Sequence, residues 1–383
     1  MTSWPVARRI AYAAGPRLLA VEVPLELAVG AVLAGPLVAR WPLPAVDTAA
    51  MDGWAIRGPG PWQVVGRVLA GEPSADPLGD GQAVEIATGA CVPSGTEGVL
   101  PYEDGAIDGV DVTGPHPAGR HVRLTGDECA AGEQVLPAGV VLSPVVAGLA
   151  AALGRDTVGV HRRPRVAALV TGTELLQAGR PFGGRIRDAV GPILPGSIAG
   201  WGGELISMTL VPDDRAALLR AVADADGDVV LTSGASSVGP ADHLTGILEQ
   251  LGAQVLIDGV AVKPGHPQLL ARLADGRLLV GLPGNPLAAL CGLVTLVAPL
   301  LAALSGRPEP PLGRAVLASP LDGLAVHHLV PVRLTDGRAW PTGHGGAAML
   351  RGAALAQAFA VVEPGRSLVV GDQVALAWLP SEP

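Results

Sequence analysis

The sequence predicts a multidomain protein of the α/β plus β class, built around a central, mostly parallel, three-layer α/β domain. Three apolar runs, VAALV, DVVLT and RLLVGL, are each followed by a glycine-rich loop and a helical pattern. Apolar strands that alternate with helices are typical of a parallel sheet covered on both faces. The chain has 383 residues, more than one hydrophobic core usually serves, so further domains are expected on both sides.

The first part of the chain predicts two domains. Residues 1–57 begin with a helical pattern and end in the turn-rich WPLPAVDTAAMDGWAIRG. Residues 58–125 carry short β-branched runs such as WQVVGRVLAGE and GVDVTG, which predict a small β domain. Residues 126–163 contain the helix-like SPVVAGLAAALG, and we expect them to join residues 1–57 in a discontinuous N-terminal domain.

The second part predicts the α/β domain and a C-terminal β module. The run RRPR precedes the α/β domain, which we place at residues 164–306. The proline-rich RPEPPLGR then opens residues 307–383, where HHLVPVRL, VVEPG and QVALAWL are typical of short strands.

One segment is long and apolar enough to cross a membrane. Residues 278–306 contain no charged side chain. Gly281, Pro283, Gly284 and Pro286 interrupt it, so we expect a buried strand, a loop and a buried helix. The alternative, a membrane span, lacks an aromatic belt and basic flanks. We therefore expect no membrane partner.

Charge and cysteine content exclude other classes. A net charge of −9 argues against nucleic acid as a partner, because such binding needs clustered basic residues. Cys91, Cys129 and Cys291 are far apart and odd in number, which favours reduced, inert thiols and a cytoplasmic protein.

The loops after the three strands are the predicted ligand site. In parallel sheets, ligands bind beyond the carboxyl ends of the strands. In SGASSVGPAD, Ser233 and Gly234 begin a run of small residues that suits a phosphate cradle. The loop matches neither a Walker nor a dinucleotide pattern, and a simple tight turn is the alternative.

Two residues occur only once in the chain. Lys263, in AVKPGHP, is the only lysine, and its compact ammonium suits a small tetrahedral oxyanion or a phosphate; a solvated surface lysine is the alternative. Asn285, in GLPGNP, is the only asparagine, and we expect it to cap a helix that begins at Pro286.

Four acidic residues lie at or near the ends of these strand and helix units: Glu174, Asp188, Asp213 and Asp242. Carboxylates that converge beside a phosphate cradle commonly hold Mg²⁺ or bind a nucleotide. Taken singly, each is typical of a helix cap or a solvated turn residue, and only their joint placement favours a binding role.

These motifs resemble the molybdopterin molybdenumtransferase family, which includes bacterial MoeA and the gephyrin E domain. The resemblance runs through nearly the whole chain, in the order PAVDTAAMDGWAIRG, IATGACVPSGTEGVLPYED, TGDECAAGEQVLPAG, PRVAALVTGTELL, GRIRDAVGPIL, VPDD, DVVLTSGASSVGPADHL, VAVKPGHP and GLPGNP. It implies a homodimer with an α/β domain similar to molybdopterin adenylyltransferases and a C-terminal β-barrel-like domain. It also implies insertion of molybdenum from molybdate into adenylylated molybdopterin, with Mg²⁺ and release of AMP.

The resemblance also implies roles for single residues. Asp52 and Thr88 would face the partner subunit's cleft, and Lys263, Asp52 and Asp242 would be catalytic. Glu174 and Asp242 would hold Mg²⁺. The implied nucleotide- and pterin-binding residues are Thr88, Glu174, Asp188, Asp213, Ser233, Gly234, Lys263, His266, Pro283, Gly284 and Asn285.

Several positions depart from the family pattern. His266 stands where the family usually has a second lysine, and His328 where it has an arginine. Ala288 and Ala347 stand where it has serines. Fewer charge-assisted hydrogen bonds should weaken oxyanion binding. A non-catalytic pterin-nucleotide carrier is therefore the main alternative to the enzyme, and an assembly scaffold is a third.

Overall fold

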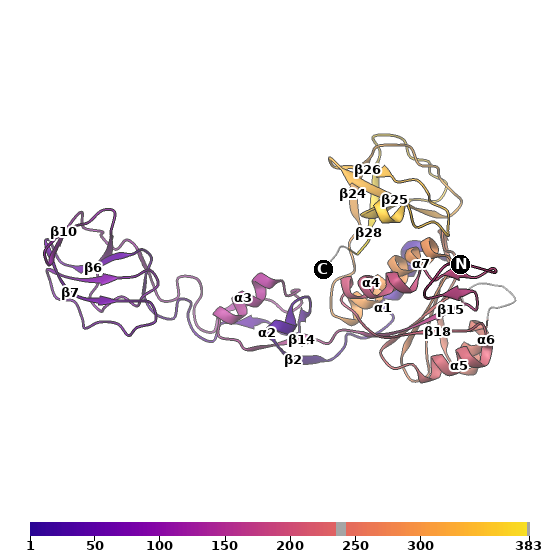
Figure 1. The fold of residues 1–383 in the computed structure, drawn as a ribbon, viewed down its shortest axis with the longest axis horizontal. Helices are drawn as coiled ribbons and strands as arrows, with labels where there is room; N and C mark the ends of the chain where they lie inside the picture. Colours follow the sequence, from indigo (N-terminus) through magenta and orange to yellow (C-terminus); the bar gives the residue numbers. More distant parts are fainter. Residues whose placement is uncertain (235–242, 381–383) are drawn as a thin grey trace. The chain divides into compact units, whose positions relative to one another are not determined.

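The computed structural model describes residues 1–234 and 243–380 (Figure 1). The chain forms two compact units. The first comprises Met1–Val21, Gly30–Ala34 and Val160–Pro383, and the second comprises Glu22–Val29 and Gly35–Gly159. We describe each unit separately.

The first unit is organised around a six-stranded sheet. Its strand order is β18 (Glu204–Val211), β15 (Arg165–Thr171), β19 (Val229–Ser233), β23 (Leu278–Leu282), β22 (Leu269–Arg272) and β20 (Gln254–Asp258). The first four strands are parallel, and β22 runs antiparallel to both of its neighbours. The predicted, mostly parallel sheet is confirmed, and β15, β19 and β23 are its three expected strands.

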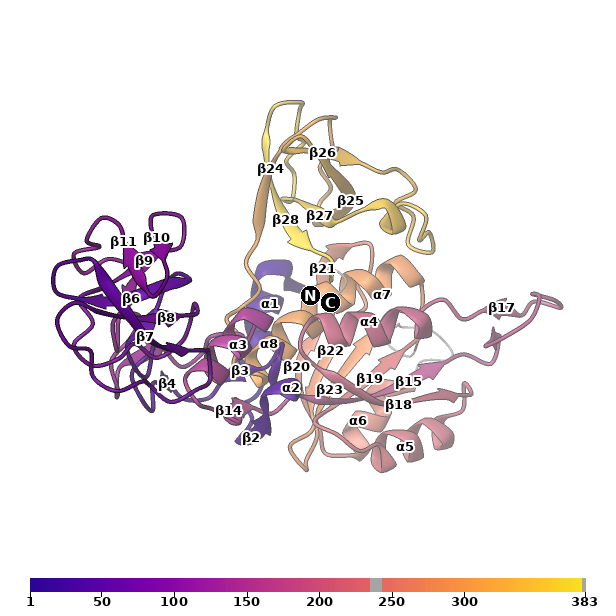
Figure 2. The ribbon, with the colours of Figure 1, turned by 60° about the vertical axis from the view of Figure 1, so that its left-hand side comes forward.

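Helices cover both faces of this sheet (Figure 2). The residues that pack on one face come from α1 (Trp4–Ala13), α4 (Leu194–Gly200), α7 (Pro286–Gly292), α8 (Ala298–Leu304) and η1 (Gly191–Ile193). Those on the other face come from α5 (Arg215–Asp224) and α6 (Leu244–Gln250). Successive strand residues alternate between the faces: Ala168 and Val170 pack on the first, Leu169 on the second. The result is the predicted three-layer domain.

The apolar segment 286–304 is a core helix. Helices α7 and α8 are joined by the π-helix η2 (Leu293–Val297). The segment Pro286–Leu304 has a mean hydropathy of 2.4, and 94% of its most apolar window is buried. The expected buried strand, loop and buried helix are confirmed.

The N-terminal helix α1 packs against this π-helix. Trp4 Nε1 donates to Thr295 Oγ1 at 3.0 Å, and the buried Arg8 donates from Nη1 to the Val294 carbonyl at 2.7 Å. A π-helix leaves irregular carbonyl positions, and here a guanidinium satisfies one of them. Residues Met1–Val21 thus belong to the first unit. From the sequence we expected residues 1–57 to join residues 126–163 in one domain.

The C-terminal strands close into a five-stranded barrel. In order they are β25 (His327–Thr335), β26 (Arg338–Pro341), β24 (Gly313–Leu317), β28 (Gln373–Trp378) and β27 (Ala358–Val362), and β27 pairs again with β25. The short helix η3 (Ala353–Leu355) precedes β27. The sheet continues beyond β25 into β21 (Val260–Lys263) and β1 (Thr2–Ser3). A strand from the middle of the chain thereby joins the barrel.

The second unit contains a six-stranded β domain. Its order is β10 (Ala106–Asp108), β11 (Asp111–Thr113), β7 (Trp62–Val68), β8 (Gln82–Ile86), β6 (Gly53–Arg57) and β9 (Gly98–Pro101). Strand β6 lies before the expected start of this domain at residue 58. The unit also contains α2 (Leu25–Ala28), α3 (Pro144–Ala152) and two short ladders, β4 (Leu37–Val38) with β13 (Gln134–Leu136) and β5 (Thr48–Ala49) with β12 (Val122–Arg123). Of the remaining short strands, β3 (Val32–Leu33), β16 (Leu175–Leu176) and β17 (Ile186–Arg187) belong to the first unit. Strands β2 (Ala20–Pro24) and β14 (Thr157–His161) have residues in both units.

Candidate functional site

The three predicted loops meet at the carboxyl ends of β15, β19 and β23. Thr171 Oγ1 donates a hydrogen bond to the Ser233 carbonyl. The Gly234 amide in turn donates to the Leu282 carbonyl at 3.1 Å. A side-chain hydrogen bond therefore joins the ends of β15 and β19, and a backbone hydrogen bond joins the second loop to the end of β23.

Glycine is required at 234 by both conformation and space. Gly234 has φ +92°, and a Cβ there would lie 2.7 Å from Thr171 Oγ1. A Cβ on Gly284 would lie 3.2 Å from the Gly234 Cα, so these two backbones also approach closely. The rest of the predicted cradle, residues 235–242, lies outside the described residues, as does Asp242.

Two of the predicted acids are held by backbone amides around the first loop. Asp213 Oδ2 accepts from the Thr173 amide at 2.9 Å, and Thr173 Oγ1 accepts from the Asp213 amide at 3.1 Å. Asp188 Oδ1 accepts from the amides of Val190 and Gly191, each at 2.9 Å. Both carboxylates thus have turn and cap roles, one of the two possibilities that the sequence left open.

Glu174 lies on the same loop, with its carboxylate exposed. Its backbone carbonyl accepts from the Ile186 amide at 2.9 Å, and the Leu176 carbonyl accepts from the Asp188 amide at 3.0 Å. Glu174 therefore directly precedes β16 and Asp188 directly follows β17, at opposite ends of this short parallel ladder. Within the described ranges, no three His, Cys, Asp or Glu side chains are grouped to hold a metal ion. The described acids alone do not form a Mg²⁺ site.

A cavity of about 520 Å³ adjoins the third loop. Its polar lining residues are Lys263, His266, Asn285 and His328. The other described lining residues are apolar or glycine and include Ala288, Leu324 and Ala347, and none of those described is acidic. The structure therefore brings four predicted features together: the lone lysine, the lone asparagine, both histidines and the two alanines that replace serines.

Strand pairing sets the positions of Lys263 and His328. In the parallel pair β21–β25, Val262 lies opposite His327, and Lys263 lies opposite His328. The two side chains reach one cavity from elements that are 65 residues apart along the chain (263 to 328). No local sequence pattern signals this pairing.

The buried side chain of Gln268 holds the loop that follows Lys263. This residue is only 1% exposed, and its Nε2 donates to the Gly265 carbonyl at 2.7 Å. Gly265 has φ +96°, and a Cβ there would lie 2.7 Å from the Ala288 carbonyl. The loop thus packs against the start of α7, and sequence reasoning missed the contribution of Gln268.

The prediction that the Asn285 side chain caps α7 is wrong in its mechanism. Asn285 occupies the N-cap position and Pro286 the first helical position, but the asparagine side chain makes no capping hydrogen bond to this helix. Instead, the Ala347 carbonyl accepts from the amides of Leu287 at 2.9 Å and Ala288 at 3.1 Å. A backbone acceptor from the barrel satisfies the helix start, which leaves the amide of Asn285 to line the cavity.

Asp52 and Thr88, both in the second unit, are hydrogen-bonded to each other. Asp52 Oδ1 accepts from the Thr88 amide at 2.6 Å. The backbone hydrogen bond from Thr88, followed by one from its side chain, lowers the pKa of Asp52. The carboxylate is thereby kept ionised and oriented in an exposed position.

A further network lies beside Asp52 and was not predicted. The Tyr102 amide donates to the Asp52 carbonyl at 3.2 Å, and its hydroxyl donates to Glu85 Oε1 at 2.7 Å. Glu85 also accepts from Arg67 Nε at 2.7 Å. Burial, followed by the bond to Glu85, raises the pKa of Tyr102 to about 12. These contacts hold the loop that carries Asp52.

Comparisons with known proteins agree with this arrangement. Residues 3–154 match the MoeA N-terminal region (domain I and II), residues 167–303 a probable molybdopterin binding domain, and residues 314–379 the MoeA C-terminal region (domain IV). The chain is 35% identical to molybdopterin molybdenumtransferase 2 of Mycobacterium tuberculosis, covering 79% of this chain and 80% of that one. It is 34% identical to the Haemophilus influenzae molybdopterin molybdenumtransferase, covering 74% and 73%.

A solved structure extends the likeness over the whole chain. The molybdopterin biosynthesis MoeA protein from Pyrococcus horikosii superposes with a TM-score of 0.81 at 28% identity, covering 99% of both chains. Sequence identity above 30% over most of two relatives, together with this shared fold, decides the assignment. The chain belongs to the molybdopterin molybdenumtransferase family.

Proposed function

We propose that the protein inserts molybdenum from molybdate into adenylylated molybdopterin and releases AMP. The observation that carries the proposal is the cavity in which Lys263 meets His266, His328 and Asn285, beside the loops at the carboxyl ends of β19 and β23. Membership of the family supports this reaction over the carrier and scaffold alternatives.

The described residues supply position and charge rather than a nucleophile. The ammonium of Lys263 attracts the oxyanion, and the glycine backbones at 234 and 284 allow the pterin nucleotide's phosphates to approach closely. Holding both substrates side by side lowers the entropic part of the barrier, and fixed positive charge stabilises the charge that develops. Asp213 and Asp188 would keep the neighbouring loop in place for the nucleotide.

Mg²⁺ remains part of the proposal. We assign Glu174 and Asp242 as its ligands, with Asp242 outside the described residues, and the exposed carboxylate of Glu174 is an oxygen donor of the type that Mg²⁺ prefers. When bound, the ion would neutralise phosphate charge.

We also propose that the protein is a cytoplasmic homodimer. Two exposed apolar side chains on helices of the second unit are consistent with self-association: Val145 on α3 is 80% exposed, and Leu27 on α2 is 70% exposed. Asp52 and Thr88 would then face the cleft of the other subunit. Cys129 and Cys291 are buried free thiols, which suits a reducing compartment.

The experiment is an AMP-release assay. Purified protein is incubated with adenylylated molybdopterin, Mg²⁺ and millimolar molybdate, and AMP is measured with and without molybdate. Molybdate-dependent AMP release supports the enzyme. Tight nucleotide binding without such release would instead identify a carrier, and no binding of either substrate would leave the scaffold.

A further inference from the structure

The charge in the cavity is unusual in its composition. One permanent cation, Lys263, lies with two imidazoles, His266 and His328, and no described lining residue is acidic. Histidine is the side chain that ordinarily gains or loses its charge between pH 5 and 8. Any positive charge that the cavity offers a ligand beyond that of Lys263 must therefore come from a proton taken up by one of these imidazoles.

We propose that this cavity takes up protons when it binds its oxyanion. We propose that His328 is the residue that makes it favour doubly charged over singly charged oxyanions. The inference rests on the proposed function, because it assumes that the oxyanion enters beside Lys263. A tetrahedral dianion carries two negative charges, and Lys263 supplies one positive charge to balance them. A protonated imidazole supplies the next, so doubly charged oxyanions are favoured over singly charged ones.

The hydrogen bond of His328 identifies the nitrogen that takes up the proton. His328 Nδ1 lies 3.4 Å from the Asp322 carbonyl, which can only accept. Nδ1 therefore carries the hydrogen of the neutral ring, and Nε2 is the atom that gains the proton. The opposing strand β21 contributes Lys263 across the pair.

The charged groups around His328 leave it free to respond to a ligand. On β27, Val362 lies opposite His328, and the next residue, Glu363, pairs with Arg366 at 3.7 Å. His327, the neighbour of His328 on β25, lies with its ring tilted beside that of Trp4. Burial lowers the pKa of His327. Asp322 is the remaining acid on an adjoining segment, and α7 and residues 345–347 contribute no charged side chain.

The direction of the pH effect follows from the sign of the charge. Protonation adds positive charge, so oxyanion binding strengthens as the pH falls and weakens as it rises. Where one proton is taken up per oxyanion, the dissociation constant rises about tenfold per pH unit. Two protons would give about a hundredfold.

The test is calorimetric titration of molybdate into the full-length protein between pH 6.5 and 8.0. Each titration is run in two buffers of different ionisation enthalpy, which reports the number of protons taken up. We expect wild type to bind about tenfold more weakly at pH 8.0 than at pH 6.5, with proton uptake. H328Q should lose most of this pH dependence, whereas H328R should bind tightly with little pH dependence.

Two further variants complete the design. H266Q measures the share of the second imidazole, and H116Q serves as the matched control, because His116 lies in the second unit and bonds to Glu97 at 3.1 Å. Equal thermal unfolding midpoints show that the variants are folded. An unchanged pH slope in H328Q, or no proton uptake in wild type, would overturn the inference.

AMP release at pH 8.0 and saturating molybdate separates this inference from the proposed function. Turnover with pH-independent molybdate binding rejects only the proton-linked capture. Proton-linked molybdate binding without turnover rejects the enzyme and retains the oxyanion site. Absence of molybdate binding at every pH rejects both.

Discussion

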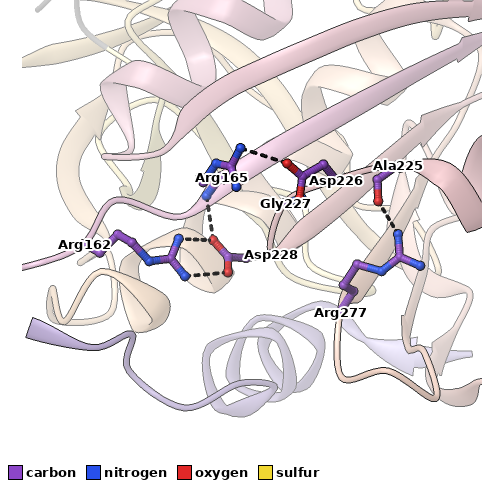
Figure 3. A network of polar contacts seen from close by, with 7 residues as sticks. All are labelled: Arg162, Arg165, Ala225, Asp226, Gly227, Asp228 and Arg277. Carbon is purple, nitrogen blue, oxygen red and sulfur yellow. Dashed lines mark hydrogen bonds and ion pairs between the residues drawn. The ribbon is translucent and has the colours of Figure 1, made fainter.

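The two ends of the central sheet use charged residues in opposite ways. At the amino ends of β15 and β19, Asp228 receives two hydrogen bonds from Arg162, at 2.7 and 2.8 Å, and one from the Arg165 amide at 2.8 Å (Figure 3). Arg165 also pairs with Asp226 at 2.9 Å. At the carboxyl end, the cavity gathers Lys263 with two histidines, and the described lining includes no acid.

This difference separates an end whose charged groups are paired with one another from the end where we propose that the ligand binds. Burial alone would raise the pKa of Asp228, but the hydrogen bonds from Arg162 and the Arg165 amide outweigh it and hold that pKa below its ordinary value. These groups already have their partners and hold the strand starts together. Lys263 has no acidic partner among the described lining of the cavity, so a ligand anion can serve as its partner.

Removing the lone lysine should have the largest effect. We expect K263A to lower AMP release by at least about a hundredfold, the usual loss when a preorganised electrostatic group is removed. The unfolding midpoint should change little, since Lys263 is exposed. K263R is the matched control: it keeps the charge but replaces a point charge with a planar fork, and we expect partial activity. Full turnover in K263A would refute the role of Lys263.

A matched pair of glycines compares the two ends directly. Gly234 and Gly276 both have φ +92°, but a Cβ on Gly276, in the turn before β23, meets nothing within 4 Å. G276A therefore measures the cost of the backbone conformation, and G234A adds the clash with Thr171. We expect G234A to be less stable than G276A by about 1–3 kcal/mol in thermal or urea unfolding. Equal destabilisation would show that the loop can move aside.

Neutralising Asp228, at the amino end of the sheet, should lower the free energy of unfolding but leave turnover unchanged. D228N removes the negative charge and replaces one of the two oxygens that accept these three hydrogen bonds by an amide donor, so we expect a loss of about 2 kcal/mol at neutral pH. Because the pKa of Asp228 is lowered in the folded protein, its contribution is present above the unfolded-state value of about 4 and disappears as the pH falls below it. Unfolding followed by fluorescence should show wild type and D228N converging in acid. A reduced kcat in D228N would contradict the separation of the two ends.

The smallest effect is expected at Asn285. Loss of a capping side chain usually costs about 1 kcal/mol, but the Ala347 carbonyl already accepts from Leu287 and Ala288. We expect N285A to change the free energy of unfolding by less than about 0.5 kcal/mol. A loss near 1 kcal/mol would show that the side chain does cap α7.

Local patterns predicted the sheet and its loops but not the cavity's walls. Apolar runs before glycine-rich loops are signals within a few residues, so β15, β19, β23 and the buried segment 286–304 could be read directly from the sequence. The pairing of Lys263 with His328 and the cap from Ala347 are long-range backbone contacts, and they leave no side-chain pattern. The resemblance identified His328 and Ala347 as departures, but only the structure places them in one cavity with Lys263.

The strand β21 has a consequence for how this protein can change over evolution. It carries the lysine and also pairs with β25 of the barrel's sheet, so residues 263–288 supply one part of the cavity lining and residues 324–347 supply the other. A recombination event that exchanged the C-terminal module alone would replace both His328 and the Ala347 carbonyl that caps α7. The oxyanion preference that we propose would then change with the barrel, while the loops after β15, β19 and β23 stayed unchanged.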